Sequence, residues 1–158
     1  MSDPVPDQPS CSCQGHAPPI PPGTYHIKNV MSGTVLDLQS SGLAEGTLIF
    51  AWSYLGGKNQ KWKLDPSGHG KTIVIRSVHA NSYMSVPYQL NAQEILPKAS
   101  YTAQQWVVTR ADRGFYLSPV QYPDYVVDLF YGSSANSAKV GLWKNHQGDN
   151  QKWYFIPD

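Results

Sequence analysis

Apolar residues alternate with polar residues, or gather in short runs, along the chain from residue 23 onward. Examples are TYHIKNV, TLIFAW, TIVIRSV, QWVV and KWYFI. Alternation of this kind, in runs rich in β-branched and aromatic residues, indicates β-strands. Turn sequences such as SSG, LGG, PSGHG, RADRG and HQGDN separate the runs. Since no window of helical length keeps one apolar face, the sequence predicts an all-β fold.

One four-residue sequence occurs twice in the chain: NQKW occupies residues 59–62 and residues 150–153. Trp106 also follows a glutamine by two positions, so the motif Q-x-W occurs three times, with separations of 44 residues (106 − 62) and 47 residues (153 − 106). Such periods indicate repeated structural units. We therefore predict three repeats, at about 23–66, 70–110 and 114–158, each with about four strands. Three units are too few for most propellers and favour a barrel with pseudo-threefold symmetry.

Composition narrows the range of partners. The chain has 158 residues, a net charge of +1 and 15% charged residues, so it lacks the basic field of a nucleic-acid-binding protein. No apolar run approaches the length of a membrane span, and the first residues have neither a basic start nor an apolar segment. We expect a cytoplasmic protein without membrane insertion, and the sequence leaves a homodimer open.

Residues 1–22 differ from the rest, since they hold seven of the 13 prolines and both cysteines. Cys11 and Cys13 are too close in sequence to bridge each other easily, and a metal site with His16 would need a fourth ligand. We therefore expect an extended Pro-rich tail over 1–22, one domain over 23–158, and neither metal nor cofactor.

The three Q-x-W copies and the opening GTYHIKNVMSGTVLDL carry a family resemblance. The chain resembles the β-trefoil lectins of the ricin-B type, and is similar to cytosolic mushroom members of that group. The resemblance covers residues 23–158. It implies a six-stranded barrel capped by three hairpins, sugar sites on the outside, and a fungal defence role against animals that eat the tissue.

The Q-x-W residues themselves have a structural interpretation. An indole buries a large apolar area, and a neighbouring glutamine can satisfy backbone groups at a turn. We assign a structural role to six residues: Gln60, Trp62, Gln104, Trp106, Gln151 and Trp153.

Other positions differ among the repeats. At twenty-five, ten and three positions before the motif tryptophan, two repeats carry the same residue types. These are Asp37, Trp52 and Asn59 in the first repeat, and Asp128, Trp143 and Asn150 in the third. The second repeat has Ser85 as its local match to the aspartate, with Leu96 and Ala103 at the other positions. Because all three residue types are lost together while Q-x-W is kept, we interpret the aspartate, tryptophan and asparagine as a functional set and the Q-x-W residues as a structural one.

Aspartate, tryptophan and asparagine together suit a sugar. A carboxylate accepts two hydrogen bonds, an amide donates and accepts, and an indole covers an apolar face. The resemblance implies that the aspartate binds O3 and O4 of galactose or N-acetylgalactosamine, the tryptophan its apolar face, and the asparagine O3. Phe50 and Gly141 stand where some ricin-type sites have glutamine or histidine, which leaves the sugar preference open. We expect both aspartates to lie in exposed loops.

Two alternatives remain at this point. Catalysis has little support, since no nucleophile elbow, zincin helix or phosphate loop occurs, Asp37 and Asp128 belong to different repeats, and ordinary polar surface accounts for the histidines. We therefore expect no enzyme. A β-trefoil protease inhibitor could act through an exposed segment such as DRGFYLSPVQYPDY.

Overall fold

The structure is a computed structural model that describes residues 19–67, 71–86 and 98–158. In these ranges it contains twelve strands and four single turns of 3-10 helix. The strands are β1 Gly23–Asn29, β2 Val35–Leu38, β3 Ile49–Trp52, β4 Trp62–Pro66, β5 Thr72–Ser77, β6 Tyr83–Ser85, β7 Lys98–Ser100, β8 Trp106–Arg110, β9 Phe115–Pro119, β10 Tyr125–Leu129, β11 Val140–Lys144 and β12 Trp153–Pro157. The helical turns are η2 Gln39–Ser41, η3 Lys58–Gln60, η4 Phe130–Gly132 and η5 Asp149–Gln151. Cys11, Cys13, His16 and Leu96 lie outside the described residues.

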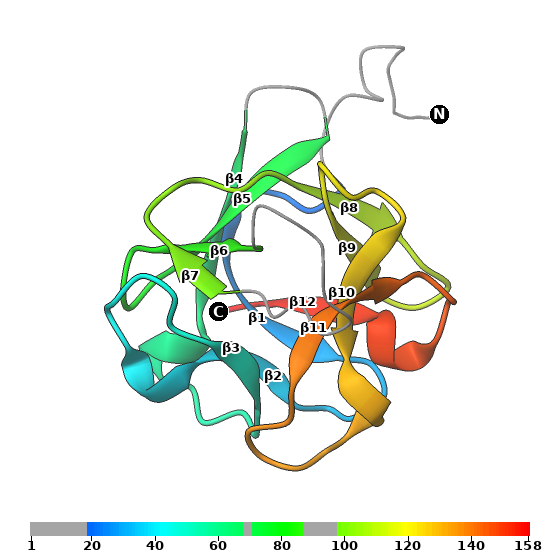
Figure 1. The fold of residues 1–158 in the computed structure, drawn as a ribbon, viewed down its shortest axis with the longest axis horizontal. Coiled ribbons are helices and arrows are strands. Elements are labelled where there is room, and N and C mark those ends of the chain that lie inside the picture. Colours follow the sequence, from blue (N-terminus) through cyan, green and yellow to red (C-terminus); the bar gives the residue numbers. More distant parts are fainter. Residues whose placement is uncertain (1–18, 68–70, 87–97) are drawn as a thin grey trace, which may run out of the picture.

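Six of the described strands close a barrel. Each pairs with its neighbours in antiparallel fashion, in the cyclic order β1, β4, β5, β8, β9, β12 and back to β1. Each repeat contributes its first and its fourth strand to the ring, which is visible around the centre of Figure 1. Closure leaves no unpaired barrel edge. The predicted β-trefoil architecture is confirmed.

The remaining strands form one hairpin in each repeat: β2–β3, β6–β7 and β10–β11. The hairpins contact one another through isolated bridges, Leu48 to Lys98 and Ala51 to Ala138. They cap one end of the barrel, as the trefoil requires.

The same backbone hydrogen bond recurs between each pair of neighbouring repeats. A valine just beyond the first strand of one repeat donates its N–H to the residue immediately before a motif tryptophan. The pairs are Val30 to Lys152 O at 2.9 Å, Val78 to Lys61 O at 3.0 Å and Val120 to Gln105 O at 3.2 Å. Pseudo-threefold symmetry therefore extends to the connections between repeats.

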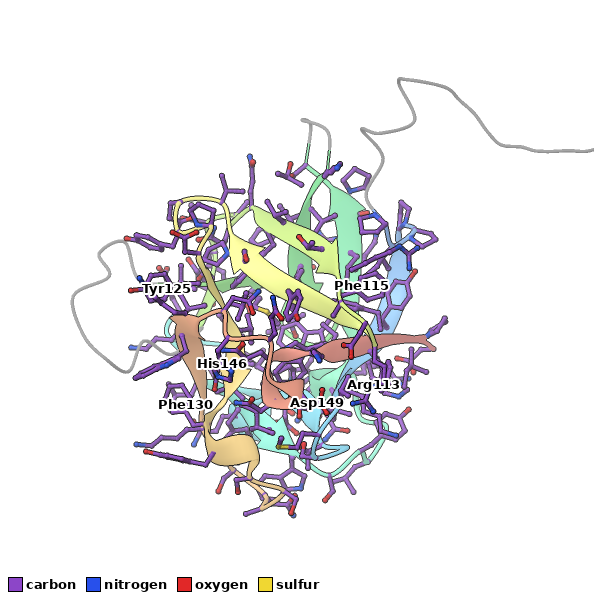
Figure 2. All side chains as sticks on the ribbon, turned by 90° about the vertical axis from the view of Figure 1, so that its right-hand side faces the viewer. Arg113, Phe115, Tyr125, Phe130, His146 and Asp149 are labelled. Carbon is purple, nitrogen blue, oxygen red and sulfur yellow. The ribbon has the colours of Figure 1, made fainter. Side chains whose placement is uncertain are left out.

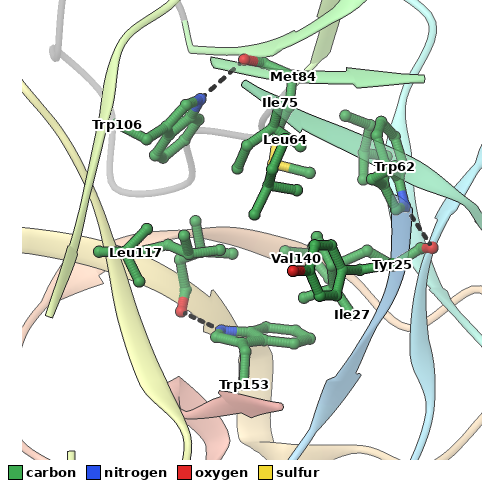
Figure 3. Packing of buried hydrophobic residues seen from close by; sticks show 14 of the residues in the cluster. Tyr25, Ile27, Trp62, Leu64, Ile75, Met84, Trp106, Leu117, Val140 and Trp153 are labelled. Atoms are coloured by element: carbon green, nitrogen blue, oxygen red, sulfur yellow. Dashed lines mark hydrogen bonds between the residues drawn. The ribbon is translucent and has the colours of Figure 1, made fainter. Parts of the chain in front are cut away.

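The three motif tryptophans lie in the core, and each is 0% exposed. Each indole Nε1 donates to a carbonyl on the hairpin of its own repeat: Trp62 to Leu36 O at 3.1 Å, Trp106 to Met84 O at 2.9 Å, and Trp153 to Val127 O at 3.0 Å (Figure 3). These hydrogen bonds join the barrel to its cap. Burial of three indoles around one axis supplies a large share of the apolar contact area.

Two expectations from sequence need correction. Ile20, assigned to the tail, is 5% exposed and packs in the hydrophobic core, and Tyr25 Oη donates to Pro21 O at 2.6 Å. The packed part of the chain thus begins before Gly23. The segment DRGFYLSPVQYPDY is no exposed loop, because Phe115–Pro119 forms strand β9 of the barrel. Within the described part of the chain, no helix is long and apolar enough to cross a membrane.

Candidate carbohydrate-binding site

Asp37 lies inside a strand. Strand β2, VLDL, is buried at all four positions, and Leu36 and Leu38 belong to the core cluster. Since side chains alternate along a strand, Asp37 points away from that cluster. It is nevertheless only 4% exposed, as is Asp128 in β10. The expectation that both aspartates occupy exposed loops is therefore wrong, because each lies in a hairpin strand and is covered by a later helical turn, η3 over Asp37 and η5 over Asp128.

Two consecutive side chains of η3 bind the Asp37 carboxylate. Asn59 Nδ2 donates to Oδ1 at 3.1 Å, and Gln60 Nε2 donates to Oδ2 at 2.9 Å. The turn is closed by Gln60 N, which donates to Gly57 O at 3.0 Å. One internal donor is thus placed on each carboxylate oxygen. Since an ionised carboxylate offers about four lone-pair positions, each oxygen keeps capacity for one more donor.

The third repeat reproduces this arrangement. Asn150 Nδ2 donates to Asp128 Oδ1 at 3.1 Å, and Gln151 Nε2 donates to Asp128 Oδ2 at 2.8 Å. Both asparagine amides also reach the next carbonyl along the strand, Leu38 O at 3.4 Å and Leu129 O at 3.0 Å. We call these two constellations the first-repeat site (Asp37, Trp52, Asn59) and the third-repeat site (Asp128, Trp143, Asn150).

The glutamines of the first and third Q-x-W motifs bind both the surrounding backbone and the aspartate carboxylate. Gln60 Oε1 accepts from Leu55 N at 2.7 Å and Gly56 N at 3.2 Å, while Nε2 also donates to Ser53 O at 2.9 Å. Gln151 likewise donates to Lys144 O at 2.9 Å and accepts from His146 N at 3.0 Å. The sequence assigned these glutamines to structure alone, whereas each also orients an aspartate.

Burial affects the ionisation of both carboxylates. Loss of solvent raises the pKa of Asp37 above the ordinary 3.8, and the hydrogen bonds from Gln60 and Asn59 offset part of that rise. Burial likewise raises the pKa of Asp128, against the lowering effects of Gln151, the nearby His146 imidazole and Asn150. Each ionised carboxylate is therefore held at some cost in solvation.

Each site has a tryptophan on the strand opposite its aspartate, partly exposed in the first repeat and exposed in the third. Asp37 pairs with Phe50, and Trp52 follows two residues later on the same face, with its ring centroid 5.6 Å from that of Phe50. In the third repeat Asp128 pairs with Gly141, and Trp143, 44% exposed, takes the place of Trp52.

The aromatic neighbour of each tryptophan comes from a different element. Phe50 is supplied by β3, whereas the neighbour of Trp143 is Phe130 of η4, at a centroid separation of 6.2 Å and edge-on. The two sites are thus similar in their polar groups and different in their aromatic surroundings.

The second repeat lacks the constellation. Ser85 Oγ donates to Lys98 O at 2.7 Å, inside its own hairpin. Among the described residues, Gln104 makes none of the contacts made by Gln60 and Gln151, and instead donates to Gln105 O and Gln121 Oε1, both at 2.8 Å. A motif glutamine therefore adopts the inward position where an aspartate is present to accept from it.

Sequence reasoning missed His146, which it treated as ordinary surface. His146 Nε2 lies 3.9 Å from Asp128 Oδ2, and its side chain is 53% exposed. Figure 2 shows His146 on the third-repeat face together with Phe130 and Asp149. Its position, three residues after Trp143 in the turn that leads to η5, was the available signal.

The third-repeat site is also tied to a neighbouring barrel hairpin. Lys152, 5% exposed, donates from Nζ to Asp149 Oδ1 at 2.9 Å and to Asp112 Oδ1 at 2.7 Å. Arg113 donates to Asp149 Oδ2 at 2.6 Å, and both residues are labelled in Figure 2. These ion pairs link η5, which carries Asn150, to the turn between β8 and β9.

No group of three or more histidine, cysteine, aspartate or glutamate side chains suited to a metal ion occurs among the described residues.

The chain is similar to known lectins. Residues 16–94 match the family described as ricin-type beta-trefoil lectin domain-like. The crystal structure of the Rhizoctonia solani agglutinin has a TM-score of 0.84 and 36% identity, over 88% of this chain and 97% of the agglutinin. The Macrolepiota procera ricin B-like lectin, solved in complex with lactose, has a TM-score of 0.75 and 29% identity, over 85% of this chain and 95% of that lectin.

A curated relative, flavastacin of Elizabethkingia meningoseptica, is 24% identical over 131 residues, and the match spans 79% of this chain but only 30% of flavastacin. The likeness to flavastacin is thus limited to one part of that protein. With the family match over residues 16–94 and the 36% identity to a lectin matched along 97% of its length, this chain belongs to the ricin-type β-trefoil lectin family.

Proposed function

We propose that the protein is a non-catalytic lectin that binds terminal galactose or N-acetylgalactosamine through its first-repeat and third-repeat sites. The observation that carries this proposal is the duplicated carboxylate. Asp37 and Asp128 each receive an asparagine donor at 3.1 Å on one oxygen and a glutamine donor on the other. The second repeat keeps its buried Trp106 and lacks these contacts. Selection for folding alone would not single out the same polar set in two repeats of three.

The arrangement suits a pair of neighbouring hydroxyls. In galactose the 3- and 4-hydroxyls lie on one side of the ring, so both can donate to the two oxygens of one carboxylate. The oxygens of Asp37 and Asp128 are already oriented by internal donors and keep capacity for these two bonds. Trp52 or Trp143 would cover the C–H face of the ring. Glucose, whose 4-hydroxyl points elsewhere, would lose one bond.

The asparagines supply a further contact. Asn59 and Asn150 use Nδ2 inside the protein, and their Oδ1 atoms lie toward Gly57 and Gly148, where a Cβ would come within 2.8 Å and 2.6 Å. A side chain at either glycine would crowd the amide oxygen, so glycine keeps it accessible. We assign Asn59 and Asn150 to the sugar O3, which would accept the Nδ2 hydrogen now directed at Leu38 O or Leu129 O, because its own hydrogen is donated to the carboxylate.

Affinity for a single sugar should be weak. Three or four hydrogen bonds at about 1 kcal/mol each, with one stacked ring, leave a Kd of roughly 1 mM after the cost of association. Two sites on one chain would then favour densely glycosylated surfaces over free sugar. Equal strength for the free sugar and a coated surface would contradict this assignment.

The direct test is retention on immobilised galactose, with elution by galactose and not by glucose. Retention should persist in a chelator, because the carboxylates would bind the sugar without an ion. The variant with both Asp37→Ala and Asp128→Ala should pass through the column, and Ser85→Ala, at the matching position of the second repeat, should be retained. A folded double variant that still bound fully would refute both sites.

From the resemblance of its sequence to cytosolic mushroom lectins, we further propose that the protein is cytoplasmic and acts in defence against animals feeding on the tissue. The matched comparison is a feeding assay with the wild type and the double aspartate variant, which should differ in toxicity. Equal toxicity of the two proteins would contradict a defence role through sugar binding.

A further inference from the structure

Residues 55 and 146 occupy the same backbone position in the two sites. Each stands seven residues before the motif tryptophan, and each donates its backbone N–H to the Oε1 of the motif glutamine. The distances are 2.7 Å for Leu55 to Gln60 and 3.0 Å for His146 to Gln151. This backbone hydrogen bond is common to both sites, so the side chains at positions 55 and 146 can be compared directly.

The side chains differ in chemistry and in placement. Leu55 is 76% exposed, and its side chain can make no hydrogen bond. His146 turns back over the third-repeat site, where a Cβ added to Gly148 would lie 2.5 Å from its Cε1. At the equivalent Gly57, the neighbour that a Cβ would meet is Asn59 Oδ1, with no ring beside it. Gly148 therefore provides the space in which the imidazole lies across the site.

The distance between the imidazole and the carboxylate is significant. His146 Nε2 lies 3.9 Å from Asp128 Oδ2, which is too long for a direct hydrogen bond. Two hydrogen bonds of about 2.8 Å that meet near a right angle at a single oxygen span about 4 Å. A ligand hydroxyl placed between the two groups could donate to the carboxylate and accept from the ring nitrogen. The spacing thus fits one bridging hydroxyl.

We infer that His146 is a specificity-determining residue of the third-repeat site, where one hydroxyl of the bound sugar donates to Asp128 and accepts from His146 Nε2. This inference rests on the proposed function. It makes the two sites unequal: the third-repeat site binds a galactose-type sugar with one more hydrogen bond than the first-repeat site, where Leu55 stands. One added hydrogen bond corresponds to about a 2- to 10-fold difference in Kd.

The experiment uses two single-site chains, Asp37→Asn to leave the third-repeat site and Asp128→Asn to leave the first-repeat site. Each is titrated with methyl galactoside by NMR. In the third-site chain, His146→Leu should raise Kd about 2- to 10-fold, and His146→Gln, which keeps a donor, should restore most of the affinity. In the first-site chain, the reciprocal Leu55→His should lower Kd. Thermal melts of all variants control for folding.

A second readout reports contact directly. The ring resonance of His146, assigned from its absence in His146→Leu, should shift during titration of the third-site chain with the same Kd as the binding curve. It should stay unchanged in the first-site chain. If both chains bind galactoside while the His146 resonance and the His146→Leu affinity are unchanged, the bridging role is refuted and the lectin function stands. If neither chain binds any galactose-type sugar, the proposed function itself fails.

Discussion

The motif glutamines allow a test of how much stability depends on tertiary context, because the same residue type occupies three related positions. We expect Gln60→Ala to destabilise the protein strongly and Gln104→Ala to change little. Gln60 is 1% exposed and makes four hydrogen bonds, to Asp37 Oδ2 and Ser53 O from Nε2, and from Leu55 N and Gly56 N to Oε1.

The magnitude follows from those four bonds. Each contributes about 0.5–1.5 kcal/mol net, and more where the partner is charged, so their loss should lower the free energy of unfolding by roughly 3–5 kcal/mol. The truncation also leaves the buried Asp37 carboxylate with one internal donor fewer. Gln151→Ala removes three such bonds and should cost slightly less.

Gln104 is only partly buried and, among its described contacts, bonds only to Gln105 O and to the Gln121 amide, so its replacement should cost about 0.5 kcal/mol or less.

The assay is urea unfolding followed by tryptophan fluorescence, with calorimetric melts in parallel. For a domain of this size 1 kcal/mol corresponds to about 2–4 °C, so Gln60→Ala should melt roughly 6–20 °C below the wild type. Its first-repeat site should also lose galactose affinity, while Gln104→Ala should bind normally. A Gln104→Ala variant as unstable as Gln60→Ala would refute the reasoning, since it would show that the motif position, and not the buried network, sets the cost.

Three further outcomes are expected. Trp153→Ala should lower the free energy of unfolding by roughly 3–5 kcal/mol because the indole is fully buried, whereas Trp143→Ala, at an exposed indole, should melt nearly as the wild type and bind sugar less well; equal melting of the two would contradict this. Asp37→Ala and Asp128→Ala should each destabilise by roughly 1–3 kcal/mol, through two lost hydrogen bonds, and halve the number of sugars bound in calorimetry. Since burial raises both carboxylate pKa values above 3.8, sugar binding should fade at a higher pH than for an ordinary aspartate as acid is added. The same rise in pKa means that each buried negative charge opposes folding at neutral pH. The stability that each carboxyl group contributes is therefore present below pH 3.8 and is lost as the pH rises through the raised pKa. A sugar-binding profile that stays unchanged down to pH 3.8 would argue against the raised pKa values.

The sequence by itself determined the strand pattern, the three repeats and the division between shared and unshared residues. These follow from local physics: the alternation of a strand is written in consecutive residues, and Q-x-W recurs because each repeat must bury one indole. Comparison of the repeats with one another then identified Asp37 and Asp128, together with the tryptophan and asparagine of each site, before any distance was known. The family resemblance supplied the barrel, the hairpins and the sugar roles that periodicity alone does not give.

Tertiary structure decided what depends on contacts between distant segments. Asp37 was expected in a loop, yet it is buried because η3, some twenty residues later, folds over the strand and supplies two donors. His146 gains its place beside Asp128 through the turn after β11, and Lys152 gains Asp112 through closure of β9 against β12. Gln104 shares its motif with Gln60 but faces outward without an aspartate to receive its amide. Hydrogen bonds and ion pairs act over a few ångströms in space, so their partners are fixed only when the chain has closed into the barrel.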